Sequence, residues 1–319
     1  MKKTFLLIFF VLFTFISCQQ DVIFYDIAQE IKLDDPTISG KVVSMDKANT
    51  VLYAANGNLN KKGLEEKRWS KVSGAPNNVE VVICADSFLY VGSLTTTDDK
   101  SSLTVYAHEL NEDGTLNTGT KWEKIKSDVS YLYSNKSTTT LNVYITIGSE
   151  IYKLSGKDSP ILQNETPITG KVAKACVRIN NKDIFLENSN CIANGEYIYV
   201  SNGNKLKSAT LPDSEETEIT WTEGNETSAE ITSMFFDGSN LYVGTKSGVQ
   251  LTTLGTEGTY TAFSNLPSNA ETSFGDREIL GVWKYDNGDN FFVSATASIT
   301  SIYDALWGYN SVSGKWNLE

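Results

Sequence analysis

The sequence predicts an all-β protein: a β-propeller of six four-stranded blades, with seven blades as the alternative. Three observations lead to this prediction. Short apolar-alternating segments are separated by turn residues, an aromatic strand phrase recurs at the spacing of propeller blades, and a Trp-centred phrase follows it. No window carries an apolar stripe of helical period over three turns. The 15 Tyr, 14 Phe and 23 Gly are residues that strands and tight turns favour.

The aromatic phrase is clearest in DSFLYVGS (86–93), GEYIYVSN (195–202) and GSNLYVGT (238–245). Weaker copies bring the number of copies to six. Their marker aromatics are Tyr53, Tyr90, Tyr144, Tyr199, Tyr242 and Phe292, separated by 37, 54, 55, 43 and 50 residues. These distances are typical of propeller blades whose connecting loops vary in length.

The second phrase has one Trp among polar residues. It occurs as KRWSKV (67–72), TKWEKI (120–125), ITWTEG (219–224) and GKWNLE (314–319). A single large apolar residue among polar neighbours indicates an outer strand with one buried and one wet face. The third and fifth blades have PILQNE and TYTAFS instead.

A longer period relates the two halves of the chain. PTISGKVV (36–43) is similar to TPITGKVA (166–173), and YAANGN (53–58) to YVSNGN (199–204). We therefore predict two three-blade halves, about 36–165 and 166–319. The largest insertion, 175–191, is expected to be an added β-hairpin turning near residues 180–183. A seventh blade built around this insertion is the rival interpretation.

The N-terminus reads MKKTFLLIFFVLFTFISC, two lysines and an apolar run that ends in Ser17 and Cys18. It resembles a bacterial lipoprotein signal, with Phe15 as in the relaxed signals of spirochaetes. The resemblance implies a signal peptide over 1–17, acylation of Cys18 with palmitate-type chains, a tether over 18–21 and a propeller domain over 22–319. Gln19 resembles the residue found in lipoproteins sent to the outer membrane. We expect a cell-envelope location, at the outer rather than the inner membrane, on either its periplasmic or its surface side.

Composition narrows the range of partners. Lys plus Arg number 27 against 39 Asp plus Glu, a net charge of −12, which repels a polyphosphate backbone and argues against nucleic acid. No cysteine spacing resembles a zinc site, and phosphate-loop and dinucleotide motifs are absent, so we expect no metal and no cofactor. Cys84 is predicted to be a buried small hydrophobe. A disulfide between Cys176 and Cys191 is left open.

The segment NLYVGTKSGVQLTTL (240–254) resembles the repeat of bacterial two-component-regulator-type propellers. The resemblance implies that the marker strand is the second of four, and that the turn after it lies on the face that receives the blade-to-blade connections. We take this as the candidate binding face. Its candidate residues are Asn56, Asn58, Asp98, Asp99, Lys100, Asn202, Asn204 and Lys246. For the two NGN sequences, turn geometry is the competing explanation, because Asn-Gly is a strong hairpin-turn signal.

Catalytic motifs are scarce, and we assign no catalytic residue. His108 is the only histidine, no GxSxG motif occurs, and the three arginines Arg68, Arg178 and Arg277 lack the Asp-box repeats of sialidase-like propellers. We therefore predict a non-enzymatic, membrane-anchored, monomeric interaction lipoprotein that contacts a protein partner through one propeller face. The alternatives are a periplasmic scaffold for envelope assembly, and a carbohydrate-active enzyme with carboxylates at the channel mouth.

Overall fold

A computed structural model describes residues 38–97, 100–137, 140–165, 172–210, 219–255, 258–266, 274, 277–285, 290–297 and 304–319. Residues 38–319 form one compact unit. The predicted start of the propeller at residue 22, the tether and the signal segment lie outside the described residues.

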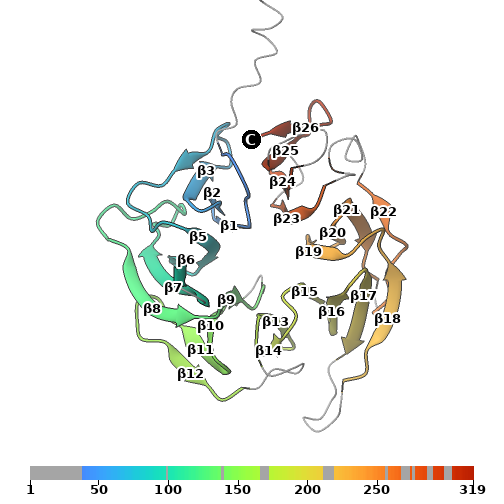
Figure 1. Ribbon diagram of the computed structural model, residues 1–319, viewed down its shortest axis with the longest axis horizontal. Coiled ribbons are helices and arrows are strands. Elements are labelled where there is room, and N and C mark those ends of the chain that lie inside the picture. The colour runs from blue at the N-terminus through green and yellow to red at the C-terminus, as the bar shows by residue number, and fades with distance from the viewer. Residues whose placement is uncertain are drawn as a thin grey trace, which may run out of the picture. The chain divides into compact units, whose positions relative to one another are not determined.

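Six four-stranded antiparallel sheets are arranged in a ring (Figure 1). The all-β fold class and the six blades are thereby confirmed. The first blade consists of β1 (Ser44–Ala48), β2 (Val51–Ala55), β3 (Leu59–Gly63) and β4 (Ser70–Lys71), and the second of β5 (Val79–Ala85), β6 (Phe88–Thr97), β7 (Lys100–Glu109) and β8 (Glu123–Val129). The third consists of β9 (Tyr131–Ser134), β10 (Val143–Ile147), β11 (Glu150–Leu154) and β12 (Ile161–Gln163), and the fourth of β15 (Cys191–Asn194), β16 (Tyr197–Asn202), β17 (Lys205–Thr210) and β18 (Thr222–Glu226). The fifth consists of β19 (Ile231–Phe236), β20 (Asn240–Thr245), β21 (Gly248–Thr253) and β22 (Ser264–Asn265), and the sixth of β23 (Ile279–Lys284), β24 (Phe291–Ala295), β25 (Ala305–Asn310) and β26 (Lys315–Leu318).

The insertion at 175–191 contributes the expected hairpin, formed by β13 (Ala175–Ile179) and β14 (Lys182–Leu186). Its turn uses Asn180 and Asn181, both at positive φ, 47° and 62°, a conformation that Asn tolerates better than most residues. The hairpin lies in the ring between the third and fourth blades (Figure 1). It is a two-stranded seventh position, and we call it the short sector.

The short sector is packed as a blade is packed, with apolar side chains on both faces. Cys176 and Phe185 join the cluster formed with the third blade. Val177, Ile179 and Leu186 join the cluster formed with the fourth blade. Every marker aromatic of the six blades lies in the second strand of its blade, as the sequence predicts.

The ring closes between the first and sixth blades without sharing strands, because β26 completes the last blade from its own residues. Ser39 forms a β-bridge with Ala305. The Glu319 side chain pairs with Lys62 and accepts a 2.9 Å hydrogen bond from the Trp69 indole. Ile38, Leu52, Phe292 and Leu306 are among the apolar residues that fill this junction, which we call the closure seam.

Candidate functional site

Antiparallel strands alternate in direction, so each second strand ends, and each third strand begins, on one face of the ring. The connections from one blade to the next reach the same face. We call it the second-strand face. The described candidate residues lie in or beside turns on this face, in the first, second, fourth and fifth blades.

The turn after β2 is organised by Asn56. Its Oδ1 accepts hydrogen bonds from the Asn58 amide at 3.2 Å and the Asn60 side chain at 2.8 Å, and its Nδ2 donates to the Ser39 carbonyl at 2.7 Å. Gly57 between them has φ +83°. These bonds give Asn56 a turn-forming role, as the competing explanation expects.

The equivalent turn after β16 is built differently. Gly203 has φ +63°, and the Asn204 side chain donates to Glu226 at 3.4 Å. Asn202 is exposed at the end of β16. In the fifth blade, Lys246 pairs with Glu230 at 2.5 Å, and both side chains are about half exposed.

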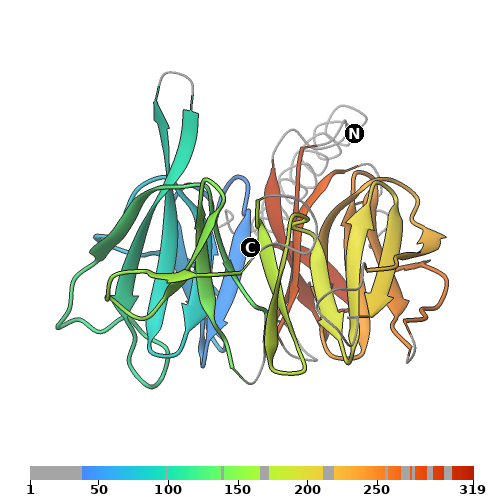
Figure 2. The ribbon, with the colours of Figure 1, turned by 90° about the horizontal axis from the view of Figure 1, so that it is seen from below.

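The TTTDDKS segment belongs to a long hairpin. Strands β6 and β7 are paired from Phe88 and Glu109 to Thr97 and Lys100, whereas β5 reaches along β6 only to Ser93. The end of this hairpin rises above the ring (Figure 2). Lys100 is exposed near its tip, and Asp98 and Asp99 lie outside the described residues.

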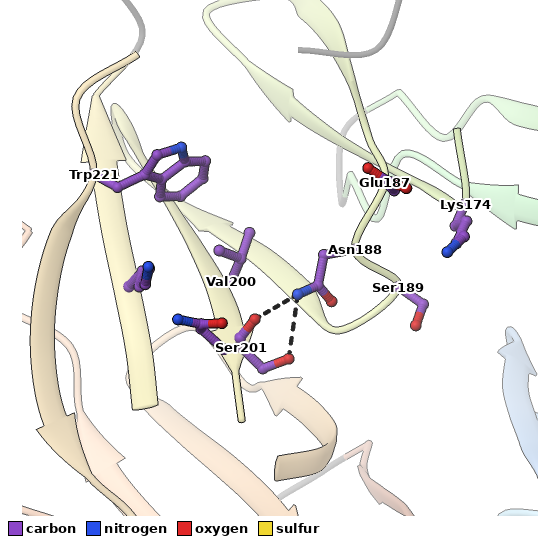
Figure 3. Close-up of a pocket in the computed structure, with 9 residues that line it drawn as sticks. Lys174, Glu187, Asn188, Ser189, Val200, Ser201 and Trp221 are labelled. Carbon is purple, nitrogen blue, oxygen red and sulfur yellow. Dashed lines mark hydrogen bonds between the residues drawn. The ribbon is translucent and has the colours of Figure 1, made fainter. Parts of the chain in front are cut away.

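A pocket of about 480 Å³ opens between the short sector and the fourth blade (Figure 3). Asn202 is the one candidate residue that lines it among those described. The other lining residues are Lys174, Glu187, Asn188, Ser189, Val200, Ser201, Lys207 and Trp221. Sequence reasoning missed them, although the insertion at 175–191 and the Trp phrase at 219–224 both pointed to this part of the chain.

The pocket exists because the short sector has two strands where its neighbours have four. Val200 on β16 belongs to the apolar cluster shared with the short sector, and Trp221 packs at the margin of that cluster. Lys207 pairs with Val200 across the sheet and reaches Glu223 at 3.2 Å. The outer part of the fourth blade therefore borders the pocket instead of being covered by a third and a fourth strand.

The rim is held by Asn188, which follows β14. Its Nδ2 donates to the carbonyl of Ser201 at 2.5 Å and contacts the Ser201 hydroxyl at 3.4 Å, as the dashed lines in Figure 3 show. Its Oδ1 accepts from the Asn190 amide at 2.8 Å. These bonds join the short sector to the end of β16, so the rim is fixed by specific contacts.

The three described cysteines are free and buried. Cys176 and Cys191, the pair considered for a disulfide, do not form one. Cys176 packs toward the third blade, whereas Cys191 belongs to the cluster between the short sector and the fourth blade. Burial raises the pKa of both thiols, which makes them unreactive.

On the opposite face, Asp183 beside the hairpin turn is the centre of a polar network. It accepts hydrogen bonds from Asn142 at 2.6 Å, Asn135 at 2.9 Å and Arg178 at 2.6 Å, and one from Tyr144. Burial opposes ionisation of Asp183, but these donors outweigh it and hold the pKa of its carboxyl below the ordinary value. The network fixes the short sector to the third blade.

The residues considered for catalysis have structural surroundings. His108 is buried with its ring 4.9 Å from that of Trp122. Arg178 serves the Asp183 network, and Arg277 lies over the Trp307 ring and donates to the Thr296 carbonyl. Within the described ranges, no cluster of three or more His, Cys, Asp or Glu is arranged to hold a metal ion.

Comparison with known proteins gives one family. Residues 5–92 match the TP013X lipoprotein family, a segment that includes Cys18 and the first blade. No curated protein matches the chain. In the described part of the chain, no helix is both long and apolar enough to cross a membrane.

Solved structures show similarity in fold. The computationally designed Ika8 protein is 10% identical, with a TM-score of 0.53 and coverage of 88% of this chain and 87% of that one. A luciferin-regenerating enzyme is 10% identical, with a TM-score of 0.50 and coverage of 86% and 92%. A protein of Bacteroides fragilis titled a putative 6-phosphogluconolactonase is 15% identical, with a TM-score of 0.45 and coverage of 88% and 92%. At these identities the likeness concerns the fold alone. Together, the family match and the ring of blades support a lipoprotein with a propeller fold, anchored to a membrane of the cell envelope.

Proposed function

We propose that this chain is a lipid-anchored binding protein that presents its second-strand face to a protein partner. One observation carries the proposal. The pocket beside the short sector opens on the same face from which the β6–β7 hairpin rises. A recess and a projecting arm on one rigid ring offer a partner two separate points of contact.

The chemistry of the pocket favours recognition over catalysis. It combines an aromatic ring, two amides, two hydroxyls and charges of both signs, which is the mixture that orients a bound group. A carbohydrate-active enzyme requires two carboxylates about 5 to 10 Å apart. Among the described lining residues, Glu187 is the only carboxylate.

Acylation of Cys18 is part of the proposal. Cleavage before this residue leaves Gln19, Gln20 and Asp21 between the lipid and the first apolar run. Replacement of Cys18 by Ala is expected to release the protein from the membrane fraction. Unchanged membrane attachment would contradict the anchor.

A photo-crosslinking experiment tests the binding face. A crosslinking amino acid at position 202, beside the pocket, and another at position 101, on the projecting hairpin, are expected to trap the same partner in intact cells. The matched control is position 112, an exposed residue in the connection from β7 to β8 on the opposite face. Equal labelling from position 112 would contradict the assignment of the face.

The side of the membrane is a separate question. Protease added to intact cells is expected to cleave a surface-displayed protein, whereas a periplasmic scaffold resists until the cells are lysed. This measurement separates the surface interaction protein from the scaffold lipoprotein.

A further inference from the structure

Charge is distributed unevenly around the ring. Residues 38–75, which contain the first blade, have seven Lys and Arg against three Asp and Glu, a net charge of +4 in a chain whose net charge is −12. Residues 191–276, which contain the fourth and fifth blades, have three Lys against twelve Asp and Glu, a net charge of −9. These two blades lie across the ring from the first (Figure 1). The ring is therefore electrically polarised.

The basic residues at the outer edge of the first blade are accessible to solvent. Lys61 lies in β3, Lys71 in β4, and Lys67 and Arg68 in the connection between these strands. Lys61 is partly exposed and the other three are exposed. Neighbouring strands are about 4.8 Å apart, so Lys61 and Lys71 both begin within about 5 Å of the outer edge of the blade.

Strand register extends this basic surface to the second blade. Lys61 pairs with Tyr53, and Lys124 with Tyr106. Both tyrosines pack in the apolar cluster between the first and second blades, so Lys61 and Lys124 lie on the facing sides of these blades. Lys124 is exposed in β8, the outer strand of the second blade. We define the basic rim as Lys61, Lys67, Arg68, Lys71 and Lys124.

Three acidic residues lie close to the basic rim in the sequence and neutralise it only in part. Glu65 and Glu66 belong to the connection from β3 to β4, and Glu66 accepts a 2.9 Å hydrogen bond from the Gly63 amide of its own turn. Glu123 reaches Lys157 of the third blade at 3.8 Å. In the part of the chain that the structure describes, the four lysines of the rim form no ion pair. The rim therefore keeps an excess of positive charge.

A lipid on Cys18 does not by itself determine which side of the ring meets the membrane. Cys18 lies 20 residues before Ile38, a length of chain that reaches at most about 70 Å. A polarised ring aligns near a negatively charged surface, with its basic side toward that surface. The Debye length is about 8 Å at physiological salt. Charges at the contact therefore dominate, and the acidic blades across the ring repel the surface only weakly.

We propose that the basic rim docks on the anionic phospholipid headgroups of the membrane that anchors the protein. The ring then stands edge-on to the bilayer, which leaves the second-strand face open to a protein partner. The short sector and its pocket lie across the ring from the first blade (Figure 1), on the side away from the bilayer. An acyl chain and a basic surface together bind a membrane more firmly than either alone. This inference rests on the lipid anchor of the proposed function and adds the orientation of the ring.

The test uses the lipidated full-length protein in vesicles of phosphatidylcholine, either alone or with equimolar phosphatidylglycerol. A photo-crosslinking amino acid at position 70, in β4, reports contact with lipid. Position 222, in the outer strand of the fourth blade, is the matched control. We expect at least fivefold more lipid labelling from position 70 when phosphatidylglycerol is present, and no increase from position 222. At 1 M salt, where the Debye length is about 3 Å, the increase should disappear.

Charge variants test the contribution of the rim itself. Each basic residue close to an anionic bilayer is worth about a fivefold change in affinity. The double variant Lys67→Gln, Lys71→Gln is therefore expected to abolish the increase in labelling that phosphatidylglycerol causes. The double variant Lys153→Gln, Lys182→Gln removes the same charge from the third blade and the short sector, and should leave the increase unchanged.

Three outcomes overturn the inference: equal effects of the two double variants, equal labelling from position 70 on the two kinds of vesicle, or an equal increase from position 222. A fourth is the capture of a protein instead of lipid from position 70 in intact cells, with capture lost in the Lys67→Gln, Lys71→Gln variant. That result would assign the basic rim to an acidic protein surface.

Flotation of the vesicles distinguishes the basic rim from the lipid anchor. Protein that floats with both kinds of vesicle, even at 1 M salt, has the anchor, and the labelling then decides whether the rim docks. Flotation only with phosphatidylglycerol, lost at 1 M salt, would contradict the anchor and support the rim. Failure to float with either kind of vesicle would contradict both.

Discussion

The closure seam and the short sector are two places where the ring departs from simple repetition, and they are treated in opposite ways. At the seam, two complete blades meet, and the charged end of Glu319 is enclosed by Lys62 and Trp69 above an apolar cluster. In the short sector, two strands fill the inner part of the ring and leave a pocket beside the fourth blade. The ring closes through contacts between the inner strands of neighbouring sectors. The outer part of the short sector is therefore not needed for closure.

The comparison is tested most severely by Phe292→Ala at the seam. Phe292 is fully buried, with its ring 5.8 Å from that of Trp69, and its loss should cost about 3–5 kcal/mol of unfolding free energy. Urea unfolding measures the change. The matched substitution on the side of the short sector is Ile161→Ala, because Ile161 shares a face of the third blade with Tyr144, which contacts Phe185. It should cost less than about 1 kcal/mol because the side chain is 56% exposed. Similar losses of unfolding free energy at both positions would contradict the difference between the closure seam and the short sector.

Asp183→Ala tests what holds the short sector in place. Removing this carboxylate leaves Arg178 and three other donors without their acceptor, and should cost about 3 kcal/mol. The lowered pKa of Asp183 adds a pH signature. Its stabilisation is present above the unfolded pKa and is lost as pH falls below that value through the folded pKa. The alanine variant should lack this loss in acid, which unfolding curves below pH 4 would reveal.

Asp46, which faces the second blade from β1, should show the opposite pH dependence. Burial raises the pKa of Asp46 to about 6, against the lowering effect of the Cys84 and Lys47 amides that donate to it. Because the folded state holds the proton more tightly, stability is highest below the unfolded pKa and falls by about 2 kcal/mol as pH rises from about 4 to about 6. Asp46→Asn should reduce this dependence of the unfolding free energy on pH. An unchanged dependence would assign the effect to other titratable groups.

Glu319→Gln should give the smallest of these effects. The amide keeps one oxygen for the Trp69 indole but loses the charge that pairs with Lys62, so we expect a loss of about 1 kcal/mol. Thermal unfolding at low and high salt measures it, and the largely buried seam pair should be only weakly salt-dependent. Glu230→Gln, which breaks the half-exposed pair with Lys246, is the control and should leave stability unchanged.

Much of the architecture was predictable because its signals are local. Tyr53 and Tyr199 stand at equivalent points of their second strands, and the NGN sequences after them have the positive-φ glycine of a tight turn. The Trp phrases lie at the fourth strands, and the insertion folds as a hairpin at the expected turn. The alternation of apolar and polar residues, the residues that form turns and the spacing of the repeats can all be read directly along the chain.

The candidate site was predictable only in part. The second-strand face was expected from the resemblance to the propeller repeat, but its candidate residues are spread over four blades. Asn202 alone of the described candidate residues borders the pocket. Lys174 and Trp221 border it as well, although they are far apart in the sequence. Their proximity depends on which blades flank the hairpin.

By itself, then, the sequence determined a repeated β architecture and the acidic composition of the chain, because these depend on residue types and their spacing along the chain. Only the tertiary structure decided that the hairpin occupies a place of its own in the ring, that Ile161 lies on the side of the short sector, and that a pocket opens between the short sector and the fourth blade. Those features follow from packing between strands distant in sequence, which no local pattern records.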